Sequence, residues 1–246
     1  MRVLITNDDG INAPGLLVVA KWAAKRFDQV VLAAPTNQQS GKSHAINIHQ
    51  PIHIQRVPYP VDDIVAYSVD STPVDCVRYA TIGLRQSFDL IISGINRGYN
   101  IGEDILYSGT CGAIFEAALR GICGVALSTH YTTFDTAEAE LDNIFDYIFD
   151  NQLFALNSIY NVNIPDNTPK GILVTKMGGP YYSDEFIAAD EHTFHQEGYM
   201  VYEFGTDLTV DTDATMNGYT TITPLSVKRD NPDVAELLWE RLKLNK

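Results

Sequence analysis

Two adjacent carboxylates follow the first apolar run of the chain. Residues 3–5 are bounded by turn-forming residues, and Asp8 and Asp9 come just after them. Such a run is typical of a buried central strand, and ligands of open α/β sheets bind beyond the carboxyl ends of the strands. The two carboxylates repel each other unless a cation or a shared proton relieves them, and a hard divalent metal is the simplest cation. The alternative is that one caps the next helix and the other is solvated, but Asn12 is also a suitable cap.

Two polar loops are expected at the same edge of the sheet. Residues 30–33 are typical of a second buried strand, and the loop 34–43, with Ser40, follows it. A further buried strand over 89–93 leads into the loop 94–102, where glycines allow close backbone approach and Asn96 offers a neutral oxygen ligand. Polar loops are more often simple connections than sites, and Lys42 lacks the glycine spacing of a P-loop.

A third loop precedes a predicted helix over 113–120. Ser108, Gly109 and Thr110 are small residues just before it, so the free N–H groups and the dipole at its amino terminus would attract an anion without Lys or Arg. The alternative is an ordinary Ser or Thr cap.

The elements that must position these residues alternate between strands and helices. Helical patterns over 14–27 and 73–84, and from about 136, lie between the predicted strands, and the last strands expected in the main sheet are 159–164 and 172–176. This order indicates one large α/β domain with right-handed crossovers. Alternating residues within 44–69 predict strands with one solvated face.

The pattern changes after residue 176. Aromatic and acidic segments over 177–225, with a strand-like alternation at 199–204, predict a projecting hairpin region and its return, and 226–246 ends in a helix capped at Asn231. The single domain 1–246 therefore consists of a core (1–176), this projection and a C-terminal helix. Large apolar surfaces outside the sheet usually find a partner, so we expect at least a dimer.

Composition excludes several classes of protein. A net charge of −14 disfavours long nucleic acids and anionic membranes as partners. Three cysteines without metal-ligand spacing, and no leader or transmembrane run, indicate a reduced cytoplasmic protein. The nucleophile elbow of serine hydrolases and the dinucleotide-binding glycine motif are missing, and Cys111 lacks the arginine of a phosphate-binding thiolate loop.

Several short motifs in sequence order resemble those of the SurE family, the stationary-phase survival-protein nucleotidases. They are Asn-Asp-Asp-Gly at 7–10, Ala-Pro at 34–35 with Gln-Ser-Gly at 39–41, Thr-Pro-x-Asp-Cys-Val at 72–77, Ser-Gly-Ile-Asn at 93–96 with Gly98 and Asn100, Tyr-Ser-Gly-Thr at 107–110, Thr-Asp at 212–213, Gly-Tyr at 218–219 and Ile-Thr-Pro-Leu at 222–225. The resemblance spans nearly the whole chain. Ser71 and Cys111 depart from it, where the family commonly has Gly and Val.

The resemblance implies a Rossmann-like three-layer α/β/α domain with a mostly parallel sheet. It further implies a divalent-metal phosphatase for nucleoside monophosphates that forms dimers or tetramers through its carboxyl-terminal part. Carried over by position, the metal ligands are Asp8, Asp9, Ser40 and Asn96.

The resulting hypothesis is hydrolysis of a nucleoside 5′- or 3′-monophosphate with one Mg²⁺ or Mn²⁺ per subunit. Asp8 or Asp9 would assist catalysis, either with a water molecule or through a covalent aspartyl route. The phosphate would be bound by Asn12, Ser108, Gly109 and Thr110. A nucleotide-binding regulatory module without turnover, and a phosphatase for polyphosphate or sugar phosphates, are the alternatives.

Overall fold

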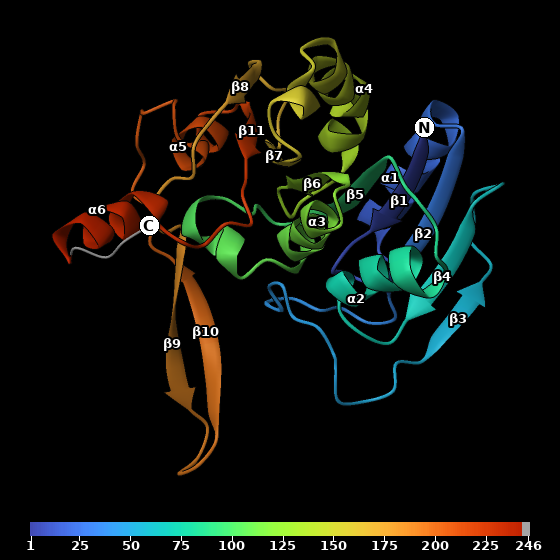
Figure 1. The fold of residues 1–246 in the computed structure, drawn as a ribbon, viewed down its shortest axis with the longest axis horizontal. Helices are drawn as coiled ribbons and strands as arrows, with labels where there is room; N and C mark the ends of the chain where they lie inside the picture. The colour runs from blue at the N-terminus through green and yellow to red at the C-terminus, as the bar shows by residue number, and fades with distance from the viewer. Residues whose placement is uncertain (243–246) are drawn as a thin grey trace.

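A nine-stranded, mostly parallel sheet forms the centre of the molecule (Figure 1). The computed structural model describes residues 1–242. The sheet order is β3-β4-β2-β1-β5-β6-β7-β11-β8, in which β3 and β11 run antiparallel to their neighbours β4 and β7. Its strands are β1 (Arg2–Thr6), β2 (Gln29–Pro35), β3 (Ile54–Val57), β4 (Val65–Val69), β5 (Leu90–Arg97), β6 (Cys123–Thr129), β7 (Ile159–Ile164), β8 (Ile172–Val174) and β11 (Thr220–Pro224).

Helices cover both faces of this sheet. The helices and helical turns are α1 (Pro14–Arg26), α2 (Pro73–Arg78) with a π-helical turn η1 (Tyr79–Gly83), the 3-10 turns η2 (Gly102–Leu106) and η3 (Leu153–Ala155), α3 (Gly109–Leu119), α4 (Asp135–Asp150), α5 (Asp211–Met216) and α6 (Pro232–Arg241). Side chains of α1 and α4 share one core with Val3 and Ile5, whereas α2 and α3 share another with Leu4. Because successive strand residues point to opposite faces, β1 contributes to both cores. This arrangement confirms the three-layer α/β/α prediction.

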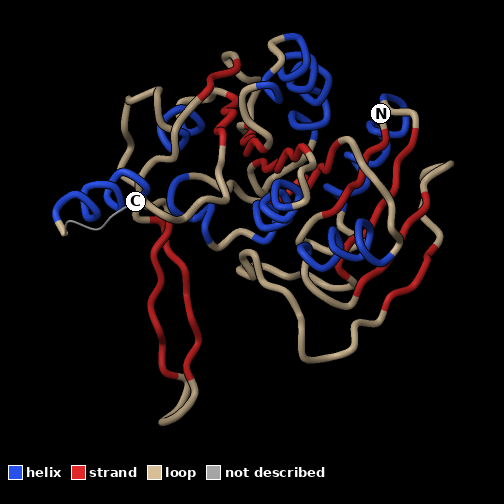
Figure 2. The backbone as a smooth tube through the Cα atoms, in the orientation of Figure 1, coloured by secondary structure: helices blue, strands red, loops and turns tan. Residues whose placement is uncertain are grey.

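One predicted strand is wrong. The segment 44–49 is a long loop without strand structure, clearly visible beside β3 in Figure 2. Its backbone hydrogen bonds go to the start of α2 instead of a sheet, because the Thr72 hydroxyl donates to the Ala45 carbonyl at 2.7 Å and the Asp75 carboxylate accepts from the Asn47 amide at 2.9 Å. The later part of the stretch does form β3 and β4, and the predicted helix is present as α2 and its π-helical continuation.

The prediction that the main sheet ends with 172–176 is also wrong. After the projection, the chain returns as β11 and inserts between β7 and β8. The strand escaped notice because its threonines look polar in the sequence, yet Thr220, Thr221 and Thr223 are buried. Two of their hydroxyls pair with other buried threonines, Thr223 with Thr175 at 2.8 Å and Thr221 with Thr215 at 3.1 Å.

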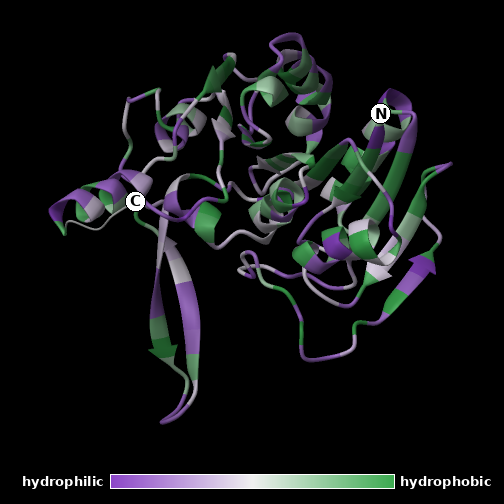
Figure 3. Cartoon of the chain, viewed as in Figure 1, coloured by the Kyte–Doolittle hydropathy of each residue, from purple (hydrophilic) through white to green (hydrophobic). Residues whose placement is uncertain are grey.

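The predicted hairpin projects from the body of the molecule (Figure 1). It consists of β9 (Tyr182–Ala188) and β10 (Phe194–Met200), so it ends before the predicted limit of residue 204. Phe186 and Phe194 are exposed on it, and α6 buries none of its residues. Figure 3 shows hydrophobic segments on both elements, away from the core. Among the described residues, no helix has both the length and the apolar character needed to cross a membrane.

Candidate active site

The loop that carries the two carboxylates is held rigidly beyond the end of β1. The Asn7 side chain accepts a hydrogen bond from the Gly10 amide at 3.2 Å and donates one to the Gly10 carbonyl at 2.9 Å. Gly10 has φ +102°, a conformation that favours glycine. The Gln39 amide also donates to the Asp8 carbonyl at 2.7 Å, which joins this loop to the loop after β2.

Asp8 is a buried carboxylate held by Thr110. The Thr110 hydroxyl donates to Asp8 Oδ1 at 2.6 Å, and the Thr110 amide donates to Oδ2 at 3.2 Å. Burial raises the pKa of Asp8 to about 6 against the lowering effect of these Thr110 bonds, and the charge of Asp9 raises it further. The negative charge of Asp8 is therefore not balanced by a positive charge from residues 1–242. A bound cation would provide that positive charge.

Asp9 is more accessible than Asp8. Its carboxylate accepts two long hydrogen bonds of 3.3 Å, from the Gln38 side chain and from the Arg97 amide. Burial raises its pKa, opposed by Arg97 and Gln38. The two carboxylates thus share one environment but differ in how firmly they are held.

The other two predicted ligands lie in the same cavity. Asp8, Asp9, Ser40 and Asn96 all line a cavity of about 870 Å³. The Ser40 hydroxyl accepts from Gln38 at 3.0 Å, and the Asn96 amide group donates to the Gly98 carbonyl at 2.8 Å, so the Asn96 side-chain oxygen remains available as an acceptor. The register shift between β5 and β6 at Ser93 and Asn96 lies at this edge. Three loops far apart in sequence therefore converge as predicted.

The charges around this cavity fit a hard cation. Five carboxylates line it, from Asp8, Asp9, Glu103, Asp104 and Asp184, against the single guanidinium of Arg97. A phosphate monoester would be repelled by this lining unless a cation offset it. No group of three or more His, Cys, Asp and Glu suited to a metal occurs among residues 1–242. A cation here would therefore use two carboxylates together with neutral oxygens, a donor set that suits Mg²⁺ or Mn²⁺.

The amino terminus of α3 faces the same cavity. Ser108 is its N-cap, and the Ser108 hydroxyl accepts from the Cys111 amide at 3.1 Å, as the capping alternative predicted. Ser108 also lines the cavity, and the Gly109 amide has no hydrogen-bond acceptor within residues 1–242. A Cβ on Gly109 would lie 3.0 Å from the Cβ of Asp8, so the helix end approaches the carboxylate closely.

The structure separates the remaining phosphate-binding candidates from this group. Both hydrogen-bond donors of Thr110 are engaged with Asp8. Asn12 is exposed, is not among the residues that line the cavity, and does not cap α1, whose N-cap is Ala13 without a side-chain bond. The capping prediction for Asn12 is therefore wrong, because the Asn7 side chain already organises this turn. A phosphate contact by Asn12 stays a prediction.

Sequence reasoning missed several residues around the site. The side chains of Asn161 and Asn163 of β7 donate hydrogen bonds to the Asn100 carbonyl at 2.7 and 2.9 Å. These bonds hold the loop after β5 against β7. Asp211 accepts from the amides of Gly102 and Gly178 and ties that loop to the root of the hairpin. Two polar residues on one face of a predicted buried strand were a signal for the asparagine pair, whereas Asp211 lies too far along the chain to be associated with the site.

The two departures from the SurE pattern have local effects. The Ser71 hydroxyl donates to Asp75 at 2.6 Å, at the start of α2. Cys111 is buried with its thiol 3.5 Å from the Asn161 side-chain oxygen, and burial raises the pKa of Cys111 to about 12, so the thiol stays protonated. Neither residue lines the cavity.

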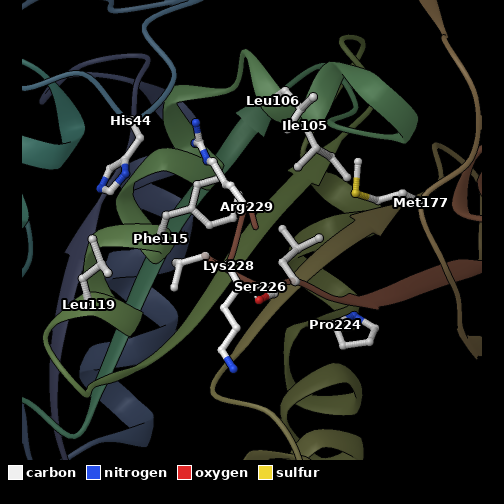
Figure 4. Close-up of a pocket in the computed structure, with 12 residues that line it drawn as sticks. His44, Ile105, Leu106, Phe115, Leu119, Met177, Pro224, Ser226, Lys228 and Arg229 are labelled. Atoms are coloured by element: carbon white, nitrogen blue, oxygen red, sulfur yellow. Dashed lines mark hydrogen bonds between the residues drawn. The ribbon is translucent and has the colours of Figure 1, made fainter. Parts of the chain in front are cut away.

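A second cavity, of about 500 Å³, also has Leu106 in its wall (Figure 4). Leu106 therefore lines both this cavity and the one that contains Asp8. Its lining is mainly apolar, with Phe115, Leu119 and Met177, and its basic side chains are His44, Lys228 and Arg229. None of the described residues that line it carries a carboxylate, so it lacks the anionic oxygen ligands that the first cavity offers to a cation.

Comparison with known proteins gives a consistent result. The family model described as survival protein SurE matches residues 3–184. The chain is 37% identical over 238 residues to 5′-nucleotidase SurE of Clostridium beijerinckii, covering 92% of each chain, and 36% identical over 250 residues to 5′-nucleotidase SurE of Clostridium botulinum, covering 96% of this chain and 97% of that one. The crystal structure of the SurE protein from Aquifex aeolicus superposes with a TM-score of 0.81 and 29% identity, covering 98% of this chain and 100% of that chain.

Proposed function

This chain belongs to the SurE family, and on that premise we propose that it is a metal-dependent phosphomonoesterase that hydrolyses nucleoside monophosphates. The observation that carries the proposal is the cavity itself. It combines two repelling carboxylates, neutral oxygen donors and a helix amino terminus, which together suit one hard cation and one phosphoryl group. The names of the relatives, 5′-nucleotidase SurE, support the same activity.

Asp8, Asp9, Ser40 and Asn96 would hold a Mg²⁺ or Mn²⁺ ion, one per subunit. When bound, such an ion polarises a phosphoryl oxygen and stabilises the charge that develops during displacement. Thr110 acts through Asp8: its hydroxyl and amide fix both carboxylate oxygens and favour the charged form that a metal requires.

The phosphoryl charge would be received at the start of α3. The Gly109 amide and the Ser108 hydroxyl proton remain available, and the helix dipole adds partial positive charge. Arg97 also lines the cavity, with its guanidinium 5.3 Å above the Phe134 ring. Among residues 1–242, it is the one cationic side chain in the lining of this cavity.

Asp9 is the better candidate to assist the attack. Both oxygens of Asp8 are engaged by Thr110, one of them at only 2.6 Å, whereas the bonds to Asp9 are 3.3 Å long. A proton lost by an attacking water would therefore be accepted at Asp9.

The wider setting of the protein follows from the same features. The substrate is a small nucleotide, and the excess of acidic residues argues against long nucleic acids or anionic membranes as partners. The buried free thiols of Cys76 and Cys111 support a reducing, cytoplasmic compartment. The exposed apolar residues of the hairpin and α6 support assembly into a homodimer or homotetramer.

A phosphate-release panel tests this proposal. Nucleoside 5′- and 3′-monophosphates, polyphosphate and sugar phosphates are each incubated with the full-length protein, with and without chelator. We expect release from nucleoside monophosphates that chelator abolishes. Binding without release would indicate a regulatory nucleotide-binding module, and faster release from polyphosphate or sugar phosphates would assign a different substrate class.

A further inference from the structure

The active cavity extends well beyond the residues that the phosphoryl group needs. The rest of its lining, here named the far end, includes Tyr99 after β5 and residues near the root of the hairpin, Tyr182, Asp184, Gln196 and Gly198. A cavity of about 870 Å³ is in the size range of sites for complete small ligands, roughly 300–1,000 Å³. We propose that this far end is the nucleobase subsite and that Asp184 and Gln196 select bases that carry an exocyclic amino group. The inference rests on the proposed phosphomonoesterase activity.

The hairpin root is fixed firmly enough to serve as a wall of a site. The Tyr182 amide donates to the Asp104 carboxylate at 3.1 Å, and the hydroxyls of Tyr182 and Tyr131 are hydrogen-bonded. The neighbouring Tyr181 is buried and accepts from the Val201 amide at 3.0 Å. The hairpin thus projects from the molecule, but its first residues are part of the body.

Aromatic side chains are part of the far end. Tyr99 and Tyr182 are half-buried and line the cavity. Tyr99 packs at 5.7 Å between ring centroids on His130, which packs at 4.8 Å on Tyr131. A base in the cavity therefore meets rings that are held in place by their neighbours, which is the usual way in which proteins bind the faces of bases.

Hydrogen-bond acceptors also belong to the far end. The Gln196 amide group donates to Asp184 Oδ2, which orients both side chains and leaves Asp184 Oδ1 and the Gln196 oxygen as acceptors. Asp184 pairs with Gly198 across the hairpin, so no side chain stands opposite it. Acceptors in this position match the amino groups of guanine, adenine and cytosine, whereas the carbonyl of uracil would have only the second N–H of Gln196 as a donor.

The hairpin also supplies matched control positions. Glu185 and His195 are the immediate neighbours of Asp184 and Gln196, but they alternate to the opposite face and do not line the cavity. Glu185→Ala and His195→Ala therefore remove similar groups from the same strands without reaching a bound base.

The test measures kcat/KM for two substrate pairs that differ at an amino group, GMP against IMP and CMP against UMP, with ribose 5-phosphate as the substrate without a base. In the unmodified protein we expect a preference for the amino-bearing member of at least one pair of about tenfold, the size of one net hydrogen bond. Asp184→Ala and Gln196→Ala should reduce that ratio toward one. Tyr99→Ala should lower the ratio of nucleotide to ribose 5-phosphate turnover roughly tenfold, and Tyr99→Phe should restore it.

Ratios within a pair cancel general changes in stability or charge, and circular dichroism of each variant checks folding. The proposal would be overturned by equal kcat/KM within both pairs. It would also be overturned if the preference survived in Asp184→Ala and Gln196→Ala, or if Glu185→Ala and His195→Ala abolished it equally. Hydrolysis of ribose 5-phosphate as fast as of any nucleotide would also overturn it while leaving a phosphomonoesterase. If no phosphate monoester is hydrolysed, it is the proposed function that fails.

Discussion

At the scale of single residues, the site depends on Asp8, a buried carboxylate that forms no ion pair with any residue of the described range 1–242. The pKa of Asp8 is raised to about 6 by burial, and Thr110 limits that rise. A carboxylate of this kind costs stability when charged, and binding of a cation offsets the cost. The adjacent carboxylates could be recognised from the sequence because acidic pairs after a buried strand are unusual. The role of Thr110 could not, since only the fold brings it to Asp8.

Ser108→Ala separates transition-state stabilisation from helix capping. If the Ser108 hydroxyl stabilises the phosphoryl group as charge builds, its loss should depress kcat on the order of 10²-fold with a smaller change in KM. Loss of the cap alone costs about 1 kcal/mol of stability. Steady-state kinetics and thermal melting of the same variant measure both effects. If Ser108→Ala lowers the Tm but turns over substrate as fast as the unmodified protein, Ser108 is purely structural. Phosphate recognition would then be assigned to the loops that contain Ser40 and Asn96.

At the scale of elements, α3 connects the active cavity to a buried ionic cluster about two turns along the helix. Glu116 is buried and contacts Arg78, Arg120 and His44, with the Arg78 contact at 3.0 Å and the Arg120 contact at 2.7 Å. Burial would raise the pKa of Glu116, but the bonds from His44 and the two arginines outweigh it and lower the pKa to about 2. This cluster fixes α3 against α2 and the loop that contains His44.

The cluster predicts a pH-dependent loss of stability. Because the folded pKa of Glu116 lies below its ordinary value of 4.5, its contribution is present above about pH 4.5 and is lost as the pH falls toward 2. Glu116→Gln should lower the free energy of unfolding by roughly 3 kcal/mol at pH 7. Urea unfolding at several pH values should show this difference shrinking below pH 4.5. Glu236→Gln, on the exposed face of α6, is the control, and an equal effect in both variants would remove the cluster from the account.

The strands differ in how accurately the sequence predicted their positions. Strands with continuous apolar runs, such as β1 and β2, were predicted with nearly the observed bounds, because burial on both faces leaves a clear pattern. Strand β11 was missed because its threonines look polar in the sequence, yet they are buried, and Thr221 and Thr223 pair with threonines outside the strand. The loop 44–49 alternates like a strand, but Thr72 and Asp75 take its backbone hydrogen bonds.

At the scale of the whole molecule, the active cavity is assembled from segments that span most of the chain. Loops after β1, β2 and β5 converge with the start of α3 because parallel strands end at one edge of the sheet. This convergence was predictable from the order of strands and helices. The contribution of the hairpin root was not, because its contact with the body depends on tertiary contacts such as those of Tyr182 with Asp104 and Tyr131.

The exposed apolar residues of the hairpin and α6 predict self-association. Phe186 and Phe194 on the hairpin, and Leu237 and Leu238 on α6, are too exposed for an isolated chain with no partner. Light scattering at micromolar protein should give a mass of at least twice the 27.3 kDa of one chain. Phe186→Ser with Phe194→Ser should reduce it if the hairpin is part of the interface. A mass near that of one chain for the unmodified protein would contradict the prediction and leave the active-site proposal intact.

Metal-dependent nucleotide hydrolysis at Asp8 is tested most directly by titrating metal into chelator-treated protein. Calorimetry measures metal binding, and nucleotide turnover is measured in the same samples. We predict one Mn²⁺ or Mg²⁺ per chain and turnover that rises in step with metal occupancy. In Asp8→Asn both should be lost while the melting temperature is preserved, because Asn removes a buried charge that the metal-free protein must tolerate. Glu103→Gln, an exposed acid of the same cavity, should retain both. Nucleotide turnover by metal-free protein, or unchanged binding and turnover in Asp8→Asn, would contradict the account.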